Sequence, residues 1–209
     1  MTHLVLASPN QDRPSLWKQG LGSFSVTTLK AHGLPPLLDH TVRTNPEMLL
    51  LDFDLLKLND LDCAADLGRL CTTTKVIVLS GIISEDTEWS LLKSGVRGFC
   101  LNDSKPQLIK QVVEAVQQGE LWMRRTLTCR LLDELGKTSS KNKTYQASLS
   151  LLNNLTQREF DIAVRVGNGE NNKQIAQACA ITERTVKSHL TEVYQKLGNY
   201  ILDSLTDKK

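Results

Sequence analysis

The sequence lacks any long apolar stretch. A membrane-spanning helix needs about 20 consecutive apolar residues, whereas the run Met48-Leu49-Leu50-Leu51 meets Asp52 at once. The first residues, from Met1 to Ser8, also lack the basic start and the long apolar region of a secretory signal. We therefore expect a cytoplasmic protein that has no membrane partner.

Cysteine is present, but not in a pattern that binds metal or forms a disulfide framework. The five cysteines are odd in number, widely spaced and include no Cys-x-x-Cys pair, which disfavours both kinds of site. The four histidines form no cluster with a nucleophile, and no glycine-rich phosphate loop of the Walker type occurs. The sequence thus predicts a protein that is not an enzyme and that has no metal site and no cofactor.

An excess of charge of one sign is also absent. Lys and Arg number 25 against 23 Asp and Glu, which leaves a formal charge of +2. That balance excludes nucleic-acid binding by bulk charge alone, so any DNA binding must depend on local placement of basic groups. The 209 residues, 40% of them hydrophobic, allow one large domain or two small ones with a real core.

The first two thirds of the chain alternate between strands and helices. Short apolar runs that stop at turn residues predict strands, and amphipathic segments between them predict helices. Alternating strands and helices predict an α/β fold with a parallel sheet and helices on both faces. The expected strands are residues 4–7, 24–29, 48–53, 75–80 and 98–101, and the expected helices are residues 15–21, 85–94, 105–116 (capped by Ser104) and 120–135.

The composition changes after residue 135. Residues 136–144 are small, polar and basic, which is typical of a linker. We therefore predict an α/β domain at residues 1–119, a linker helix with a flexible linker at 120–149, and a separate helical domain at 150–209.

The pattern after the linker is purely helical. Thr156 can cap a helix, and Glu159 three residues later completes the arrangement called a capping box. A second, short helix is expected from Asn172, and a third from Thr182 to Leu197 with its end at Gly198. Two short helices joined by a tight turn fit a helix-turn-helix.

The third of these helices has two distinct faces. Apolar residues 186, 190, 193 and 197 share one narrow face. Short hydrogen-bonding groups and two long cations on the other face can enter a major groove, although an ordinary solvated face is the alternative. This polar face comprises Arg184, Ser188, Thr191 and Gln195, with Lys187 at its edge.

The segments 155–159, 169–176, 181–190 and Lys196-Leu197-Gly198 together resemble the LuxR/NarL-type helix-turn-helix. The whole chain is similar to a two-domain response regulator of two-component systems. That resemblance implies a doubly wound, flavodoxin/CheY-like receiver with a five-stranded parallel sheet, followed by an all-α helix-turn-helix domain. It also implies a sequence-specific transcriptional regulator that binds double-stranded DNA as a homodimer. By the same resemblance Lys187, Ser188 and Thr191 face bases, and Lys173, Thr182, Arg184, Thr185 and Lys196 contact phosphates.

The chain departs from this family at its end. Members usually continue well past Lys-Leu-Gly with a fourth helix that forms the dimer on DNA, whereas only residues 199–209 follow here. A short helix over Tyr200–Leu205 remains possible on the pattern. We expect the dimer contact to be reduced, or to be supplied by the N-terminal domain.

The receiver-like part keeps only some of the residues that receiver chemistry uses. Phosphoryl transfer to an aspartate needs Mg²⁺, and Mg²⁺ needs oxygen ligands, mainly carboxylates. The resemblance places the phosphoacceptor at Asp52 and two switch positions at Ser80 and Phe99. However, Ser8-Pro9 stand where the family has an acidic pair, and Asn102 stands where it has a lysine.

These losses predict a pseudo-receiver in which Asp52 is not used. One carboxylate without a partner pair should hold Mg²⁺ poorly, and Asp54 lies beyond the strand. Without the lysine, the phosphoryl oxygens also lose a cation. The alternative is a working receiver with unusual ligands.

Other inputs could replace phosphorylation. Some members with degenerate receivers bind cyclic di-GMP through a Trp-x-x-Arg pattern, and Trp122 and Arg125 match that spacing. An arginine can stack on guanine and donate to its edge or to phosphate, but Trp122 can equally be a core residue that packs its helix. A receiver-like surface that docks a protein partner is a further alternative.

Overall fold

The computed structural model describes residues 2–56, 61–138 and 155–206. It divides into two compact units, residues 1–118 together with 201–209, and residues 119–200. Each unit is described by itself below. None of the helices in the described ranges combines the length and the apolar character that crossing a membrane requires.

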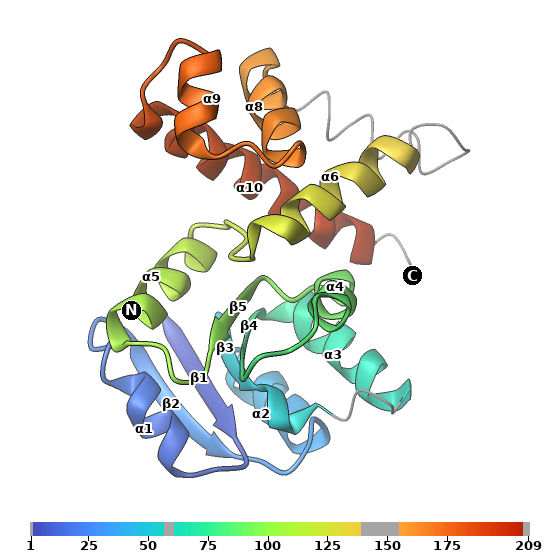
Figure 1. Cartoon of the computed structure of the whole chain (residues 1–209). Coiled ribbons are helices and arrows are strands. Elements are labelled where there is room, and N and C mark those ends of the chain that lie inside the picture. The colour runs from blue at the N-terminus through green and yellow to red at the C-terminus, as the bar shows by residue number, and fades with distance from the viewer. Residues whose placement is uncertain (1, 57–60, 139–154, 207–209) are drawn as a thin grey trace. The chain divides into compact units, whose positions relative to one another are not determined.

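The N-terminal unit is built on a sheet of five parallel strands in the order β2-β1-β3-β4-β5 (Figure 1). Leu6 pairs with Leu50 and Leu50 with Ile77, so the apolar centres of the strands lie in register. The predicted α/β fold with a doubly wound parallel sheet is confirmed. The strands are β1 His3–Ser8, β2 Ser25–Lys30, β3 Met48–Asp52, β4 Lys75–Ser80 and β5 Gly98–Leu101.

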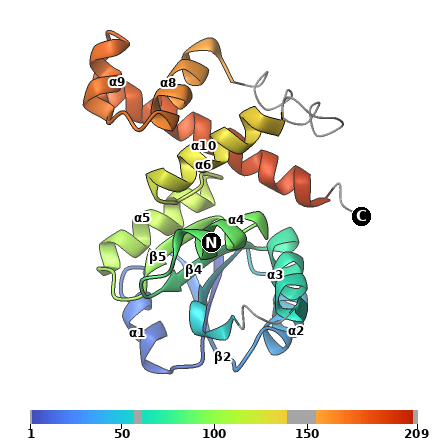
Figure 2. The same cartoon turned by 45° about the vertical axis from the view of Figure 1, so that its right-hand side comes forward.

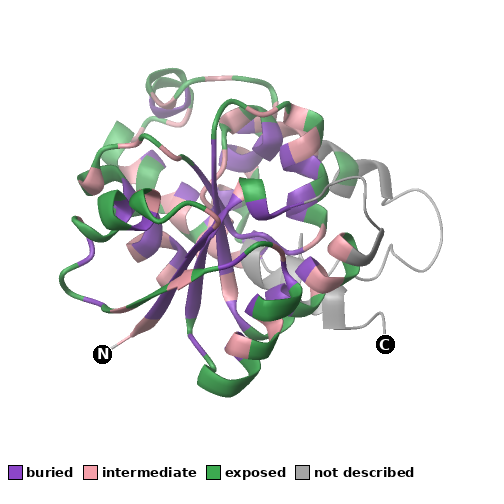
Figure 3. Cartoon of the chain, turned by 90° about the horizontal axis from the view of Figure 1, so that it is seen from below, coloured by how far each residue is buried: buried purple, intermediate pink, exposed green. Residues whose placement is uncertain are grey.

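Helices cover the sheet, so the central strands are buried between them (Figure 3). Helix α1 packs beside α5, and α2 packs beside α3. A Cβ atom at Gly20 would lie 2.2 Å from the carbonyl oxygen of Pro106, so glycine permits the close approach of the chain after α1 to the start of α5. The helical elements are α1 Asp12–Lys18, α2 Pro35–Thr44, the 3-10 turn η1 Phe53–Leu55, α3 Leu61–Thr73, α4 Glu85–Lys93 and α5 Pro106–Gln117.

Several predicted boundaries in this unit need correction. Helices α2 and α3 were not predicted; the two prolines of α2 occupy its first turn, where a missing N–H costs nothing. Helix α1 begins three residues before the predicted Ser15. The N-cap position of α5 is held by Lys105 rather than Ser104, and its side chain makes no capping hydrogen bond.

The elements described in the C-terminal unit, within residues 119–138 and 155–200, are helices (Figure 2). Its core is formed by Ile162, Val166, Ile175, Ala176, Val186 and Leu190. The predicted capping box is present, since Thr156 accepts from the Glu159 N–H and the Glu159 carboxylate accepts from the Thr156 N–H. The helices are α6 Arg125–Thr138, α8 Gln157–Gly167, α9 Asn172–Ala178 and α10 Glu183–Thr206.

Two predicted helix boundaries in this unit were wrong. Helix α10 does not end at Gly198 but continues to Thr206, since a glycine inside a helix costs only about 1 kcal/mol relative to alanine. The expected separate helix after Gly198 is therefore part of α10. Helix α6 begins at Arg125 rather than Glu120, because Gly119 has a φ of +93° and residues 120–124 are not helical.

Candidate DNA interface and the receiver-like site

The first part of α10 presents its polar face to solvent. Arg184, Lys187 and Ser188 are exposed, whereas Val186 on the opposite face is completely buried in the helical core. Thr191 is half-buried on the polar side. The helix therefore offers cations and a hydroxyl outward while its apolar face holds it in place, which is the arrangement a recognition helix needs.

The start of α10 is fixed by its own side chains. The Thr185 N–H donates to the Thr182 hydroxyl oxygen at 3.1 Å, and the two hydroxyl oxygens lie 2.8 Å apart. Thr182 thus satisfies one of the free N–H groups of the first turn. Thr182 is exposed and Thr185 half-buried, so the hydroxyl of Thr182 also remains accessible.

Helix α9 places Lys173 next to a well-capped turn. The Asn171 side chain accepts from the Gln174 N–H at 3.0 Å, and the Gln174 side chain accepts from the Asn171 N–H at 2.8 Å. Lys173 lies between these two residues and is exposed. Its ammonium group is therefore carried on a rigid turn.

Lys196, for which the sequence predicts a phosphate contact, makes an ion pair within its own unit. Its Nζ atom lies 2.6 Å from the Glu159 carboxylate, and the Glu159 residue is only 5% exposed. Burial alone would raise the pKa of Glu159, but Lys196 and the bonds from Thr156 bring that pKa below its ordinary value. Lys196 thus joins α10 to the first turn of α8, a role its place in the motif did not reveal.

In the N-terminal unit, Asp52 ends β3 with a fully buried carboxylate. The Ser8 hydroxyl, at the end of β1, donates to its Oδ2 atom at 2.5 Å. The Asp54 N–H donates to Oδ1 at 3.1 Å. Ser8, which stands where the family has an acidic residue, is therefore hydrogen-bonded to Asp52, the predicted phosphoacceptor.

Arg13 on α1 completes this cluster. Its Nη1 atom lies 2.9 Å from each oxygen of Asp52 and 2.5 Å from Oδ2 of Asp54. The hydrogen bonds from these two carboxylates raise the pKa of the Arg13 guanidinium. One guanidinium thus binds both acidic side chains at the carboxyl edge of the sheet.

Sequence reasoning missed Arg13. It lies five residues beyond Ser8, and no spacing in the sequence shows that its side chain reaches β3. Within the described residues, no three His, Cys, Asp or Glu side chains gather in a way that could hold a metal ion.

The predicted switch positions adjoin this edge. Ser80 and Phe99 are both buried, with exposures of 5% and 8%. Asn102 takes part through its backbone, since its N–H donates to the Ser80 carbonyl at 2.8 Å and its carbonyl accepts from Trp17 Nε1 at 3.0 Å. Asn102, which stands where the family has a lysine, thus links the end of β5 to β4 and to α1 through hydrogen bonds of its backbone.

Trp122 and Arg125 are placed in the C-terminal unit. Arg125 Nη1 donates to the Asn172 side-chain oxygen at 3.3 Å, and Nη2 donates to the Glu170 carbonyl. Trp122 is half-buried in the segment before α6. The guanidinium of Arg125 is therefore engaged with the turn before α9.

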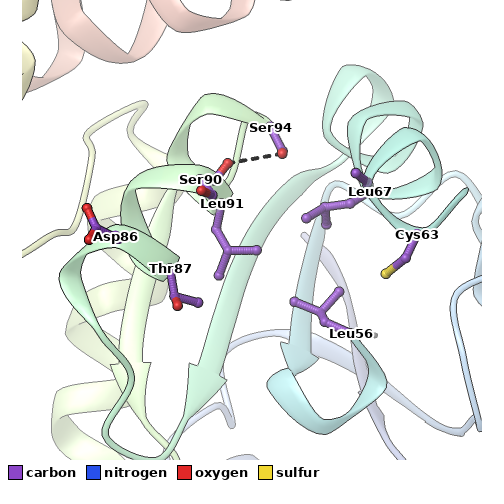
Figure 4. A pocket seen from close by; sticks show the side chains of 9 residues that line it. Leu56, Cys63, Leu67, Asp86, Thr87, Ser90, Leu91 and Ser94 are labelled. Atoms are coloured by element: carbon purple, nitrogen blue, oxygen red, sulfur yellow. Dashed lines mark hydrogen bonds between the residues drawn. The ribbon is translucent and has the colours of Figure 1, made fainter. Parts of the chain in front are cut away.

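A groove lies between α3 and α4 in the N-terminal unit (Figure 4). Its volume is about 290 Å³, and Leu56, Leu67 and Leu91 line it together with Cys63 and the hydroxyl residues of α4. None of the predicted site residues lines this groove. It is therefore separate from the Asp52 cluster.

Comparison with known proteins agrees with this arrangement. Residues 153–201 match the family described as bacterial regulatory proteins, luxR family. The matched residues include all of α8 and α9 and most of α10. Among curated relatives, the transcriptional regulatory protein DegU of Brevibacillus brevis is 27% identical over 162 residues, 74% of this chain and 69% of that protein. The nitrate/nitrite response regulator protein NarP of Escherichia coli is 26% identical over 161 residues, 77% of this chain and 71% of that protein.

The fold of the whole chain is also that of known response regulators. A crystal structure of the Salmonella typhimurium RcsB response regulator superimposes with a TM-score of 0.51 at 14% identity, covering 99% of this chain and 100% of that one. The resemblance to LuxR/NarL-type response regulators is thereby confirmed. The protein is a DNA-binding transcriptional response regulator of this type, and its relatives are regulators rather than enzymes.

Proposed function

We propose that this response regulator binds specific DNA sequences without needing phosphorylation of Asp52. The observation that supports the proposal is the Arg13 guanidinium, whose Nη1 atom lies 2.9 Å from both Asp52 oxygens. The guanidinium supplies fixed positive charge where receiver chemistry requires a divalent cation.

The charges of the cluster support the proposal that Mg²⁺ binds poorly here. Mg²⁺ requires near-octahedral oxygen ligands at about 2.0–2.1 Å, but the oxygens of Asp52 already accept from Arg13, Ser8 and the Asp54 N–H. A metal ion would have to displace Arg13 and would meet its positive charge. The absence of the acidic pair removes the ligands that could offset this cost.

On the DNA side, we propose that α10 enters the major groove. Exposed basic and hydroxyl groups on one face of a helix can reach base edges, and neighbouring groups can reach phosphates. The match of residues 153–201 to the luxR family supports this assignment. We propose base contacts from Lys187, Ser188 and Thr191, and phosphate contacts from Lys173, Thr182, Arg184 and Thr185.

We further propose that the protein binds DNA as a homodimer. A structure of two RcsB dimers bound to two parallel DNAs superimposes on 100% of this chain with a TM-score of 0.50 at 15% identity. Two-fold symmetric proteins read two half-sites, which increases both affinity and specificity.

Two other inputs remain as competing proposals. The first is cyclic di-GMP at Trp122 and Arg125, which would require Arg125 to leave Glu170 and Asn172. Calorimetric titration of the protein with cyclic di-GMP distinguishes it, because we expect no heat of binding at micromolar protein. The second is a protein partner on the receiver-like unit, for which Ile82 in the loop after β4 is notable at 96% exposure.

Mg²⁺ binding tests the proposal. We expect millimolar Mg²⁺ to leave the melting temperature of the parent protein unchanged. Arg13→Ala frees the carboxylates of Asp52 and Asp54, so Mg²⁺ should raise the melting temperature of that variant by ligand linkage. Arg43→Ala, at an exposed position on α2, is the matched control. Stabilisation of the parent by Mg²⁺ that Asp52→Asn abolishes would contradict the proposal.

A further inference from the structure

Arg125 is the first residue of α6, yet its side chain serves another part of the C-terminal unit. The guanidinium donates to the Glu170 carbonyl and to the Asn172 side-chain oxygen, 47 positions away from Arg125. These acceptors flank Asn171, the residue that caps α9. Two nitrogen atoms of the planar Arg125 guanidinium therefore donate hydrogen bonds to the turn between α8 and α9.

The same turn is held from its other side by α8. Arg165 Nη1 lies 3.1 and 3.2 Å from the two oxygens of the Glu170 carboxylate. The Glu170 N–H donates to the Arg165 carbonyl at 3.1 Å. Gly169, with a φ of +82°, allows the chain to reverse here. The turn before α9 is therefore held by two arginines: Arg165 of α8 and Arg125 of α6.

Helix α6 also reaches the other helices of the unit. The Cys129 thiol donates to the Val166 carbonyl of α8 at 3.0 Å, and Leu127 is fully buried. The pKa of Tyr194 on α10 is raised by burial, and the Thr128 side chain and the positive charge of Arg125 oppose this rise only in part. Arg125 therefore lies where α6, the turn before α9, and α10 meet.

From this geometry we infer that Arg125 is a positioning residue of the DNA interface. Arg125 is not among the proposed DNA contacts, but it fixes the turn that immediately precedes Lys173. It lies on α6, outside the residues 153–201 that match the luxR family. A recognition helix reads bases only when the preceding helix sits correctly on the DNA backbone. The inference rests on the proposed DNA contacts of α9 and α10.

The main test compares Arg125→Gln with Arg124→Gln in the full-length protein. Both variants remove one positive charge, but the Arg124 side chain is exposed and precedes the helix. The probe is a duplex that the parent protein enriches from a random-sequence pool. Arg125→Gln should weaken binding about five- to twentyfold, as expected for losing two charge-assisted hydrogen bonds that hold the turn. Arg124→Gln should bind within about twofold of the parent, and Arg125→Lys should restore part of the affinity.

Two further readouts separate positioning from direct contact. The salt dependence of DNA binding should keep its slope in Arg125→Gln, because the number of phosphate contacts is unchanged. A slope lower by about 0.9 would mean that Arg125 itself contacts a phosphate, and this result would overturn the inference. Amide hydrogen exchange at residues 170–173 should be faster in Arg125→Gln without DNA. Asn172→Ala should add little to Arg125→Gln in affinity, because both remove the same contact.

The failures can be distinguished. Parent-like DNA affinity and parent-like exchange in Arg125→Gln overturn the positioning role and leave the proposed function intact. If the parent enriches no duplex from the pool, the proposed function fails, and the positioning role fails with it.

Discussion

The two polar sites of this protein are built from similar side chains but differ in what those side chains contact. At the carboxyl edge of the sheet, Asp52 is fully buried and bonded to Ser8 and Arg13. On the outer face of α10, Arg184 and Lys187 are exposed to solvent. The first site directs its charges inward, and the second directs them outward.

This difference supports different proposed roles for the two sites. A buried carboxylate must be paired, since an isolated charge is very costly in the interior, and here the pairing comes from within the fold. Exposed cations on a rigid helix stabilise the fold little, so their arrangement is better explained by a partner. Under the proposed function, the Asp52 cluster serves the fold of the N-terminal unit, whereas the exposed side chains of α10 serve DNA binding.

The largest effect is expected at the outward-facing site. Lys187→Ala should weaken binding to the preferred duplex by about 1–3 kcal/mol and relax specificity at one position, as the loss of a base contact does. A scrambled duplex should be bound almost as well by the variant as by the parent. Fluorescence anisotropy with the two duplexes measures both values. Equal loss on both duplexes would show that Lys187 does not read a base.

The inward-facing site should show its effect in stability. Arg13→Ala should lower the free energy of unfolding by about 1–2 kcal/mol, because it leaves the buried Asp52 carboxylate with fewer partners; the figure is discounted because Arg13 is 31% exposed. Urea unfolding at neutral pH measures the loss. DNA affinity should stay within twofold of the parent. A large change in DNA affinity with unchanged stability would mean that Arg13 acts as a switch rather than as part of the framework.

The C-terminal unit also contains a buried charge, the Glu159 carboxylate, which forms an ion pair with Lys196. The pKa of Glu159 is lowered in the folded protein, so the unfolded chain binds its proton at a higher pH. The stabilisation from this pair is therefore present above the ordinary glutamate pKa of about 4.3 and is lost as the pH falls through the lower folded value. Glu159→Gln should cost about 1 kcal/mol at pH 7, and unfolding experiments should show that this difference shrinks below about pH 4. A constant difference across that range would rule out the ion pair as its cause.

The smallest effect is expected for a phosphate contact. Lys173→Ala should weaken all duplexes by a similar small factor and lower the salt slope by about 0.9. Titrations at several salt concentrations give that slope. Gln177→Ala, an exposed position one turn further along α9, is the control and should keep the slope of the parent. An unchanged slope in Lys173→Ala would remove Lys173 from the proposed interface.

Much of the fold followed from local patterns. The continuous apolar run at residues 48–51 predicted a strand covered on both faces, and the structure buries it completely. The Thr156 and Glu159 spacing predicted a capping box that is present. Such features depend on residues close in sequence, so a single chain reveals them.

The sequence did not reveal contacts between distant residues. Arg13 reaches Asp52 across 39 positions, and Arg125 reaches Asn172 across 47. Their side chains are long and flexible, so their partners are set by the packing of helices rather than by spacing. The glycine inside α10 misled the prediction of the helix end, because glycine is tolerated in a helix that the neighbouring structure supports.

DNA binding under phosphorylating conditions tests the central claim most directly. The dissociation constant of the full-length protein for its enriched duplex would be measured with and without acetyl phosphate plus Mg²⁺, for the parent and for Asp52→Asn. We predict the same value, within about twofold, in all four measurements, because Arg13 already occupies the Asp52 carboxylate. An affinity that rises tenfold or more in the parent, and does not rise in Asp52→Asn, would contradict the claim.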